Sequence, residues 1–122
     1  MIGGSANGFA VLAGSANFLY PALCLGATGG ILALGNVAPS QCKEIQRRYD
    51  AGDHASAREL QLKMLAPNAA VTTKHGIPGL KVAMEAVGLK AGSPRAPLRP
   101  LTDKEADDVR QTLVAAGIGR LV

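Results

Sequence analysis

The chain has 122 residues, of which 48% are hydrophobic, 18% charged and 3% aromatic, and its formal net charge is +4. The length suits one domain, and basic residues that are scattered and not interleaved with aromatic ones argue against nucleic-acid binding. Cys24 and Cys42 have neither metal-ligand spacing nor a secretory context, so we expect reduced thiols in a cytoplasmic protein.

The N-terminal third carries no charge, because no Asp, Glu, Lys or Arg precedes Lys43. A secretory signal would need a basic segment before its apolar core, and none is present. Residues 18–37 are long enough for a membrane span, but proline, several glycines and an asparagine interrupt them. We therefore expect no membrane span and place the segment in the interior of a larger α/β protein.

Two short apolar runs predict strands at residues 9–13 and 30–34. Apolar runs of this length between glycines are typical of parallel strands that are buried on both faces. Between them, residues 18–25 predict a short helix that is capped by Ser15 or Asn17. A second helix follows the second strand, so the pattern predicts a β-α-β-α succession.

From Ser40 onward the pattern is helical. Ser40 and Asp53 are candidate N-caps of two successive helices, since short polar side chains accept hydrogen bonds from the first free backbone N–H groups. Pro67 lies within the second helical pattern and is expected to kink or end it, because proline has no N–H to donate.

Two further helices complete the predicted chain. Pro78 suits the first turn of the first one. Residues 89–101 hold three of the seven prolines and predict an extended connection. Thr102 and Glu105 have the spacing of a capping box, which begins the last helix. The inner face of that helix is predicted to consist of Ala106, Val109, Leu113 and Ala116.

Chemically reactive residues are sparse. His54 and His75 have no companion at metal-ligand spacing, and we expect both to be solvated. Asp107 and Asp108 are better explained as a solvated helix face than as an acid/base pair. The six lysines all occur in polar helical or linker segments, where nothing lowers the pKa of an amine to make it a nucleophile. We therefore assign no catalytic residue, and we expect no metal and no cofactor.

Several short motifs follow one another along the chain. They are Val11-Leu12-Ala13-Gly14-Ser15-Ala16, Gly26-Ala27-x-Gly29-Gly30-Ile31-x-Ala33-x-Gly35-Asn36, Ala57-Arg58, Ile77-Pro78-Gly79-Leu80-Lys81 and Arg95-Ala96-Pro97-Leu98. In this order they resemble the C-terminal part of the dihydrodipicolinate synthase / N-acetylneuraminate lyase family, and the resemblance covers about residues 9 to 117. Residues 12–16 and 67–72 most resemble the 4-hydroxy-2-oxoglutarate aldolase branch, since the synthases tend to carry an acidic residue where this chain has Ser15.

The resemblance implies an α/β fold, the (β/α)8 TIM barrel, with appended C-terminal helices. In that family a lysine on the sixth strand forms a Schiff base with the pyruvoyl part of the substrate, assisted by a tyrosine on the fifth. Residues 1–52 would be the last two strand–helix units and residues 53–122 the C-terminal helical extension. The two substrate-binding positions that carry over are Gly14, after the seventh strand, and Ile31, on the eighth.

By the same resemblance, the lysine and the tyrosine lie upstream of residue 1. We therefore expect a truncated gene product, a misplaced start codon or one piece of a split enzyme, which would be inactive alone and mitochondrial if a targeting segment preceded it. The full-length parent would cleave 4-hydroxy-2-oxoglutarate, a 2-keto acid, to pyruvate and glyoxylate. The alternatives are a synthase-type condensation of pyruvate with an aldehyde, or a non-catalytic module that binds other subunits. Because family members commonly form homotetramers, the resemblance also implies a homo-oligomer, a tetramer that assembles through the C-terminal helices or the barrel.

Overall fold

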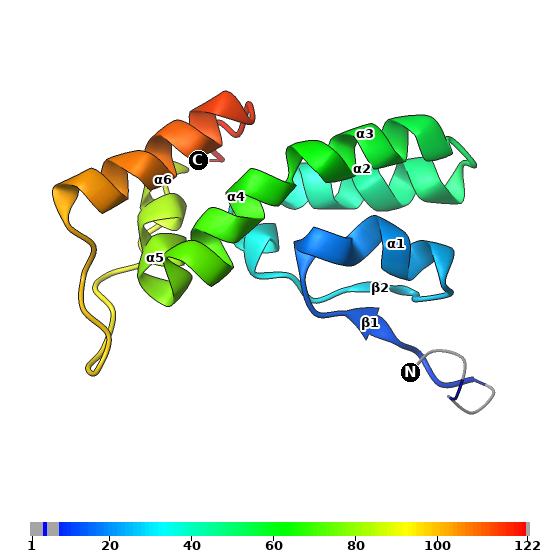
Figure 1. Ribbon diagram of the computed structural model, residues 1–122, viewed down its shortest axis with the longest axis horizontal. Coiled ribbons are helices and arrows are strands. Elements are labelled where there is room, and N and C mark those ends of the chain that lie inside the picture. Colours follow the sequence, from blue (N-terminus) through cyan, green and yellow to red (C-terminus); the bar gives the residue numbers. More distant parts are fainter. Residues whose placement is uncertain (1–3, 5–7, 122) are drawn as a thin grey trace.

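The computed structural model describes residue 4 and residues 8–121. In Figure 1 the two short strands lie at the lower edge of the molecule with helices above them, and further helices lie toward the opposite end. The elements near the strands are β1 Leu12–Ala13, the 3-10 helix η2 Ala16–Phe18, α1 Leu19–Cys24, β2 Gly29–Gly30, the 3-10 helix η3 Ala33–Asn36, α2 Pro39–Asp50 and α3 His54–Lys63. The remaining elements are α4 Leu65–Ala69, the π-helix η4 Ala70–Lys74, α5 Gly76–Ala86 and α6 Asp103–Ala115.

The two strands are parallel and are joined through α1, which confirms the predicted β-α-β succession. In their register Leu12 lies opposite Gly29, and Ala13 lies opposite Gly30. Backbone pairing continues beyond both ends of β2. Thr28 N–H donates to the Val11 carbonyl oxygen over 2.9 Å, and Ile31 N–H donates to the Ala13 carbonyl oxygen over 2.9 Å. The crossover through a helix is the connection that parallel strands require.

The strands are shorter than the predicted ranges 9–13 and 30–34, and the expected burial on both faces is wrong at their ends. Phe9 is 70% exposed and Ile31 is 75% exposed. Within the described residues each strand has one neighbour, so one edge of each strand has no partner strand. After Leu32 the backbone turns into η3, which places the side chain of Leu34 fully in the core.

The helix starts follow the sequence in part. Asp53 is confirmed as the N-cap of α3, since its carboxylate accepts a hydrogen bond from Ser56 N–H. Ser40 is not the N-cap of α2, because Ala38 has that position and Pro39 is the first helical residue. Proline suits this place because its missing N–H would have no partner within the helix.

Pro67 interrupts the helical segment, as predicted. The segment divides at Met64 into α3 and α4, and Pro67 is the third residue of α4. A proline nitrogen cannot donate to the carbonyl four residues earlier, so a continuous helix is broken there. The π-helix η4 follows at once, and Pro78 lies in the first turn of α5, as predicted.

The last helix has the predicted capping box. Glu105 N–H donates to Thr102 Oγ1 over 3.3 Å, and Thr102 N–H donates to Glu105 Oε2 over 2.8 Å. Ala106, Val109 and Leu113 are buried and Ala116 is half-buried, which confirms the predicted inner face. Residues 89–101 form neither helix nor strand and connect α5 to α6.

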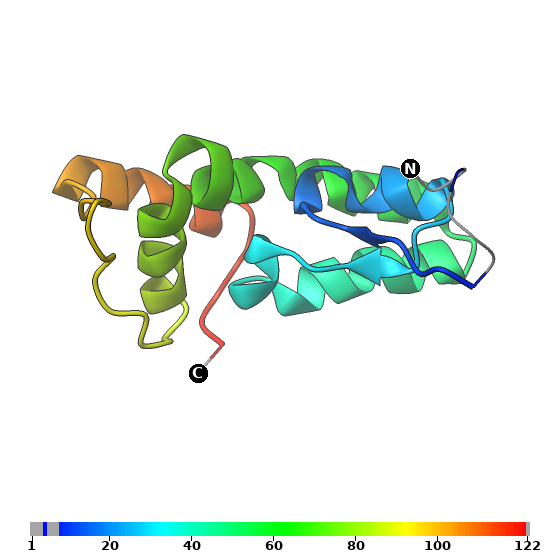
Figure 2. The ribbon, with the colours of Figure 1, turned by 90° about the horizontal axis from the view of Figure 1, so that it is seen from below.

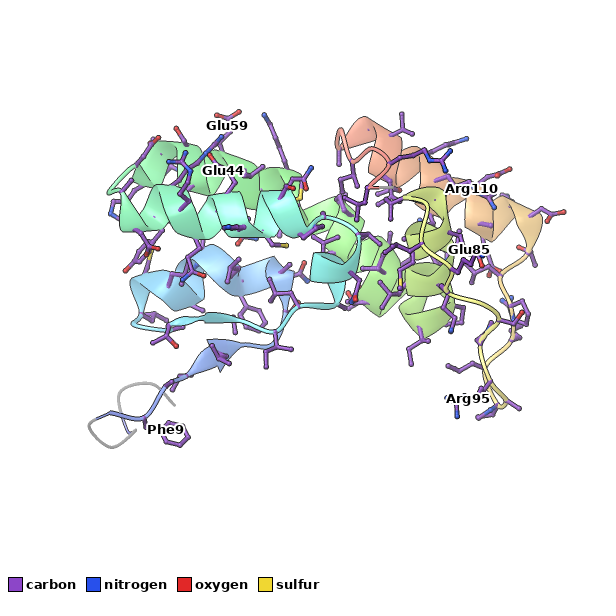
Figure 3. The ribbon with its side chains drawn as sticks, turned by 180° about the vertical axis from the view of Figure 1, so that it is seen from behind. Phe9, Glu44, Glu59, Glu85, Arg95 and Arg110 are labelled. Carbon is purple, nitrogen blue, oxygen red and sulfur yellow. The ribbon has the colours of Figure 1, made fainter. Side chains whose placement is uncertain are left out.

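One hydrophobic core joins the strands to the helices. It includes Ala13 from β1, Leu23 from α1, Ile45 from α2, Met64 between α3 and α4, and Leu113 from α6. Figure 2 shows the strands from below, between α1 on one side and α2 on the other, and Figure 3 shows Phe9 at the strand end, away from the helices. Among the described residues, no helix combines the length and the apolar character needed to cross a bilayer.

Candidate functional site

The two predicted site residues lie next to each other at the carboxyl ends of the strands. Because Ala13 is opposite Gly30, the residues that follow them, Gly14 and Ile31, are neighbours at the same edge. Ile31 N–H donates to the Ala13 carbonyl oxygen over 2.9 Å, which fixes this arrangement. The structure thus brings together two residues that are 17 positions apart in the sequence.

This edge is open on the side away from the helices. A Cβ atom placed on Gly14 would meet no other atom within 4 Å. The Ile31 side chain is 75% exposed and offers an apolar surface beside it. A small molecule can therefore approach the backbone of Gly14 and the side chain of Ile31 from the same side.

The segment after Gly14 turns sharply into a helix. Ser15 is its N-cap, because Ser15 Oγ accepts a hydrogen bond from Asn17 N–H over 3.2 Å. Ser15 thus caps the short 3-10 helix η2, whereas α1, the predicted helix, begins after Phe18 and has no side-chain cap, so the prediction that Ser15 or Asn17 caps that helix is wrong. Pro21 is the third residue of α1 and so lies in the first turn, where proline is tolerated.

Two buried side-chain amides from the later helices contact this segment, and sequence reasoning missed both. Gln61 Oε1 accepts from Tyr20 N–H over 2.8 Å, and Gln61 Nε2 donates to the Ala16 carbonyl oxygen over 2.7 Å. Asn68 Nδ2 donates to Ser15 Oγ over 3.1 Å. A sequence signal did exist: Gln61 and Asn68 follow the buried residues Ala57 and Met64 by four positions each, so both lie on an inner helix face.

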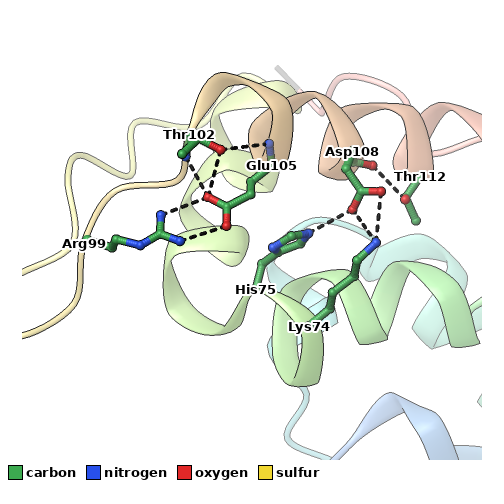
Figure 4. A network of polar contacts seen from close by, with 7 residues as sticks. All are labelled: Lys74, His75, Arg99, Thr102, Glu105, Asp108 and Thr112. Carbon is green, nitrogen blue, oxygen red and sulfur yellow. Dashed lines mark hydrogen bonds and ion pairs between the residues drawn. The ribbon is translucent and has the colours of Figure 1, made fainter.

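A second polar cluster lies at the other end of the molecule and joins η4 and α5 to α6 (Figure 4). Asp108 accepts from Lys74 Nζ over 2.8 Å and contacts His75 Nε2 over 2.9 Å. The bonds from Lys74 and then from His75 hold the pKa of Asp108 below its usual range. The cluster therefore binds η4 to α6 through a charged carboxylate.

The expectation of two solvated histidines holds for one of them. His54 is exposed and its Nδ1 lies 3.4 Å from the Tyr20 hydroxyl oxygen. The side chain of His75 is only 9% exposed, so that prediction is wrong, because the contact with Asp108 holds the ring against α6. Asp107 pairs with Arg110 over 2.7 Å, so it does not form an acid/base pair with Asp108.

A cavity of about 580 Å³ lies beside this cluster, between η4, the start of α5 and the connection that precedes α6. Its cationic side chains are already paired with carboxylates, since Arg99 binds Glu105 over 2.8 Å and Lys74 binds Asp108. Hydrogen bonds from Arg99 and from Thr102 N–H hold the pKa of Glu105 well below its usual range. In the part of the chain that the structure describes, no group of three or more His, Cys, Asp or Glu side chains is placed to hold a metal ion.

None of the lysines, all of which are described, lies on a strand or at the carboxyl edge. Each occurs on a helix or on the connection before α6. They are Lys43 on α2, Lys63 on α3, Lys74 on η4, Lys81 on α5, Lys90 on the connection and Lys104 on α6. None of the six lysines is therefore part of the strand ends that carry Gly14 and Ile31.

Comparison with known sequences gives a consistent result. Residues 4–116 match the model of the "Dihydrodipicolinate synthetase family". The 4-hydroxy-tetrahydrodipicolinate synthase of Corynebacterium jeikeium is 37% identical over 98 residues, which cover 80% of this chain and 33% of the relative. An uncharacterized DapA-like lyase of Halobacterium salinarum is 35% identical over 107 residues, which cover 88% of this chain and 35% of the relative.

Solved structures give the same picture. Dihydrodipicolinate synthase DapA-2 of Bacillus anthracis superposes with a TM-score of 0.86 at 27% identity, over 93% of this chain and 39% of that one. A putative dihydrodipicolinate synthase of Thermus thermophilus superposes with a TM-score of 0.78 at 36% identity, over 90% of this chain and 39% of that one. The chain spans about a third of the length of the curated relatives it matches.

Proposed function

The chain belongs to the dihydrodipicolinate synthetase family, and we propose that it forms the last two strand–helix units and the appended helices of a (β/α)8 barrel. In this proposal residues 1–52 supply the strand–helix units and residues 53–122 the helical extension. Two observations support it. The strands are parallel with a helical crossover, and the superposition on dihydrodipicolinate synthases covers 93% of the chain but 39% of the synthase.

The function we propose is that of one part of a class I pyruvate-dependent lyase. The observation that carries this proposal is the adjacency of Gly14 and Ile31 at the carboxyl edge of the strands, with open space over both. Barrel enzymes hold their substrates at this end of the strands. Gly14 leaves room for a keto acid to approach the main chain, and Ile31 offers an apolar contact to its pyruvoyl part.

The Schiff base requires a lysine from outside these 122 residues. Its amine would attack the keto carbon with loss of water, and the resulting iminium would accept the electron pair when the carbon–carbon bond breaks. The described lysines all lie on helices or on the connection, away from the strand ends. The part of this chain is therefore to bind and orient the keto acid, and its own lysines take no part in the chemistry.

For the substrate we propose 4-hydroxy-2-oxoglutarate, cleaved to pyruvate and glyoxylate. The support is Ser15, which stands after the first glycine where synthases tend to carry an acidic residue. Its hydroxyl oxygen is held by Asn17 N–H and Asn68 Nδ2. Condensation of pyruvate with an aldehyde is the second candidate, because several relatives are named 4-hydroxy-tetrahydrodipicolinate synthases.

A hybrid enzyme tests the proposal. Residues 9–117 replace the matching segment of the Thermus thermophilus protein, which is 36% identical. The hybrid and the 122-residue chain are each treated with pyruvate and borohydride, and adducts are mapped by mass spectrometry. We expect one reduced pyruvate adduct on a lysine of the Thermus part of the hybrid, and none on the 122-residue chain. Cleavage and condensation assays on the hybrid then separate the two candidate reactions.

Two results would overturn the proposal. An adduct on any of the six lysines of the 122-residue chain would show that this chain supplies the nucleophile. A folded hybrid that forms no adduct, while the unmodified Thermus protein does, would show that these residues do not complete a keto-acid site. Size-exclusion chromatography of such an inactive hybrid would then test the remaining alternative, a module that only joins subunits.

A further inference from the structure

Gln61 has an unusual position for a polar side chain. It lies on α3 and is only 4% exposed, yet both ends of its amide are used. The oxygen accepts from Tyr20 N–H, and the nitrogen donates to the carbonyl oxygen of Ala16. One side chain thus bridges two backbone groups that lie 41 and 45 positions earlier in the sequence.

Asn68 makes a parallel contact one residue closer to the strand. It is fully buried on α4, and its Nδ2 donates to Ser15 Oγ. Ser15 Oγ also accepts from Asn17 N–H, so Asn68 holds the side chain that caps η2. Together the two amides contact residues 15, 16 and 20, the segment that directly follows Gly14.

We propose that Gln61 is a positioning residue that fixes the backbone after Gly14, and with it the keto-acid edge, and that Asn68 supports it through Ser15. The link to the keto acid rests on the proposed function, whereas the clamp itself does not. A neutral amide is needed because it offers a donor and an acceptor at once. A methionine has a similar length but no donor and only a weak acceptor. A carboxylate would face the Ala16 carbonyl oxygen with a negative charge.

Amide hydrogen exchange of the full 122-residue chain, resolved by NMR, tests the clamp. Tyr20 N–H has the Gln61 oxygen as its acceptor, so we expect its protection factor to fall at least tenfold in Gln61→Met. Val109 and Leu113 amides on α6 are the control for global folding and should keep their protection. Unchanged protection of Tyr20 in a folded Gln61→Met protein would overturn the proposal.

A second variant covers the case in which Gln61→Met does not fold. In Gln61→Glu, a protonated carboxyl can donate to Ala16 and accept from Tyr20 as the amide does. Burial raises the pKa of such a carboxyl. Above that pKa the carboxylate cannot donate to Ala16, and its negative charge is repelled by the Ala16 carbonyl oxygen, so the side chain should leave its position between the two backbone groups. The protection of Tyr20 N–H should therefore persist at low pH and fall as the pH rises through that pKa. The unchanged chain, measured at the same pH values, corrects for the other polar and charged groups around Tyr20, which are Cys24, Tyr49, His54 and Arg58. A Gln61→Glu profile identical to that of the unchanged chain would contradict the clamp.

The hybrid enzyme separates positioning from mere stability. Gln61→Met in the hybrid should raise KM for pyruvate at least tenfold with a smaller change in kcat, since small misplacements of a binding edge weaken productive binding. If Tyr20 loses protection but KM stays unchanged, the positioning role is wrong. If the hybrid with Gln61 is itself inactive, the proposed function fails while the exchange result on the clamp stands.

Discussion

The strand region, residues 8–38, and the helical region, residues 53–121, are held together in different ways. The strand region has no charged side chain and exposes large apolar ones, among them Phe9 and Ile31. In the helical region, polar and charged groups pair with one another. The capping box of α6 and the ion pairs of Lys74 and Arg99 are examples.

The difference shows where the geometry of the candidate site is set. The polar groups of residues 15, 16 and 20 are bound by Gln61 and Asn68, which belong to the helical region. In the proposed function, the strand region supplies the surface that a keto acid touches, and Gln61 and Asn68 of the helical region supply the contacts that hold it. A change in the core of the helical region should therefore cost stability, whereas a change at the open edge should cost binding.

The largest expected effect comes from cutting a core side chain in the helical region. Leu113 is 2% exposed, so Leu113→Ala should lower the free energy of unfolding by about 2–5 kcal/mol, through lost apolar burial and the cavity left behind. The matched variant at the open edge, Ile31→Ala, should change the free energy of unfolding by less than about 0.5 kcal/mol. Urea unfolding followed by circular dichroism measures both, and equal losses in the two proteins would break the comparison.

Adding a methyl group sharpens the same contrast. A Cβ on Gly79 would lie 2.6 Å from the Ala70 carbonyl oxygen and 2.6 Å from His75 Cβ. Gly79→Ala should therefore destabilise the chain by about 1–3 kcal/mol, as overpacking does. Gly14→Ala meets no atom and should leave the unfolding midpoint nearly unchanged, while weakening pyruvate binding in the hybrid. A Gly79→Ala protein as stable as Gly14→Ala would contradict the packing of η4 against α5.

Removing a cap gives a smaller effect. Thr102→Ala should cost about 1 kcal/mol, because Glu105 N–H loses its acceptor. The matched control is Ser40→Ala, which should be nearly neutral because Ser40 follows the N-cap of α2 by two positions and does not cap it. Thermal unfolding of both variants measures the two effects. A larger fall of the unfolding midpoint in Ser40→Ala than in Thr102→Ala would contradict the assignment of Thr102 as a cap and of Ser40 as a residue that does not cap.

The smallest effect is a pH dependence of the helical region. The pKa of Asp108 is lowered by Lys74 and His75, so its ionised form stabilises the fold above the ordinary aspartate pKa of about 3.9. That stabilisation is lost as the pH falls through the lowered value. Glu44, whose pKa is lowered to about 2, titrates in the variant as well and cancels in the comparison. Urea midpoints from pH 7 to pH 2 should fall more steeply for the unchanged chain than for Asp108→Asn, and parallel curves would disprove the link.

Most of the helices could be predicted from the sequence because their signals are local. The capping box of Thr102, the cap at Asp53 and the break at Pro67 depend on residues a few positions apart, and all three are found in the structure. The predicted strand lengths were wrong because the length of a strand depends on its neighbouring strands, and a short apolar run does not show which strands those are. The adjacency of Gly14 and Ile31 follows from parallel pairing and is present.

The contacts of the site segment could not be predicted in the same way. Gln61 and Asn68 bind residues 41 to 53 positions earlier, and no short-range pattern shows which backbone groups a buried amide will meet. His75 was misjudged for the same reason, because its partner Asp108 lies 33 positions later. A polar residue on an inner helix face therefore predicts that a long-range hydrogen bond exists, but not which group is its partner.

The most direct test of the account is a crystal structure of the hybrid enzyme after reduction with pyruvate and borohydride. We predict a closed barrel in which the pyruvyl group, bound to a lysine of the Thermus part, contacts the main chain of Gly14 and the side chain of Ile31. A trapped group remote from both residues, or strands from this chain paired in another topology, would contradict it.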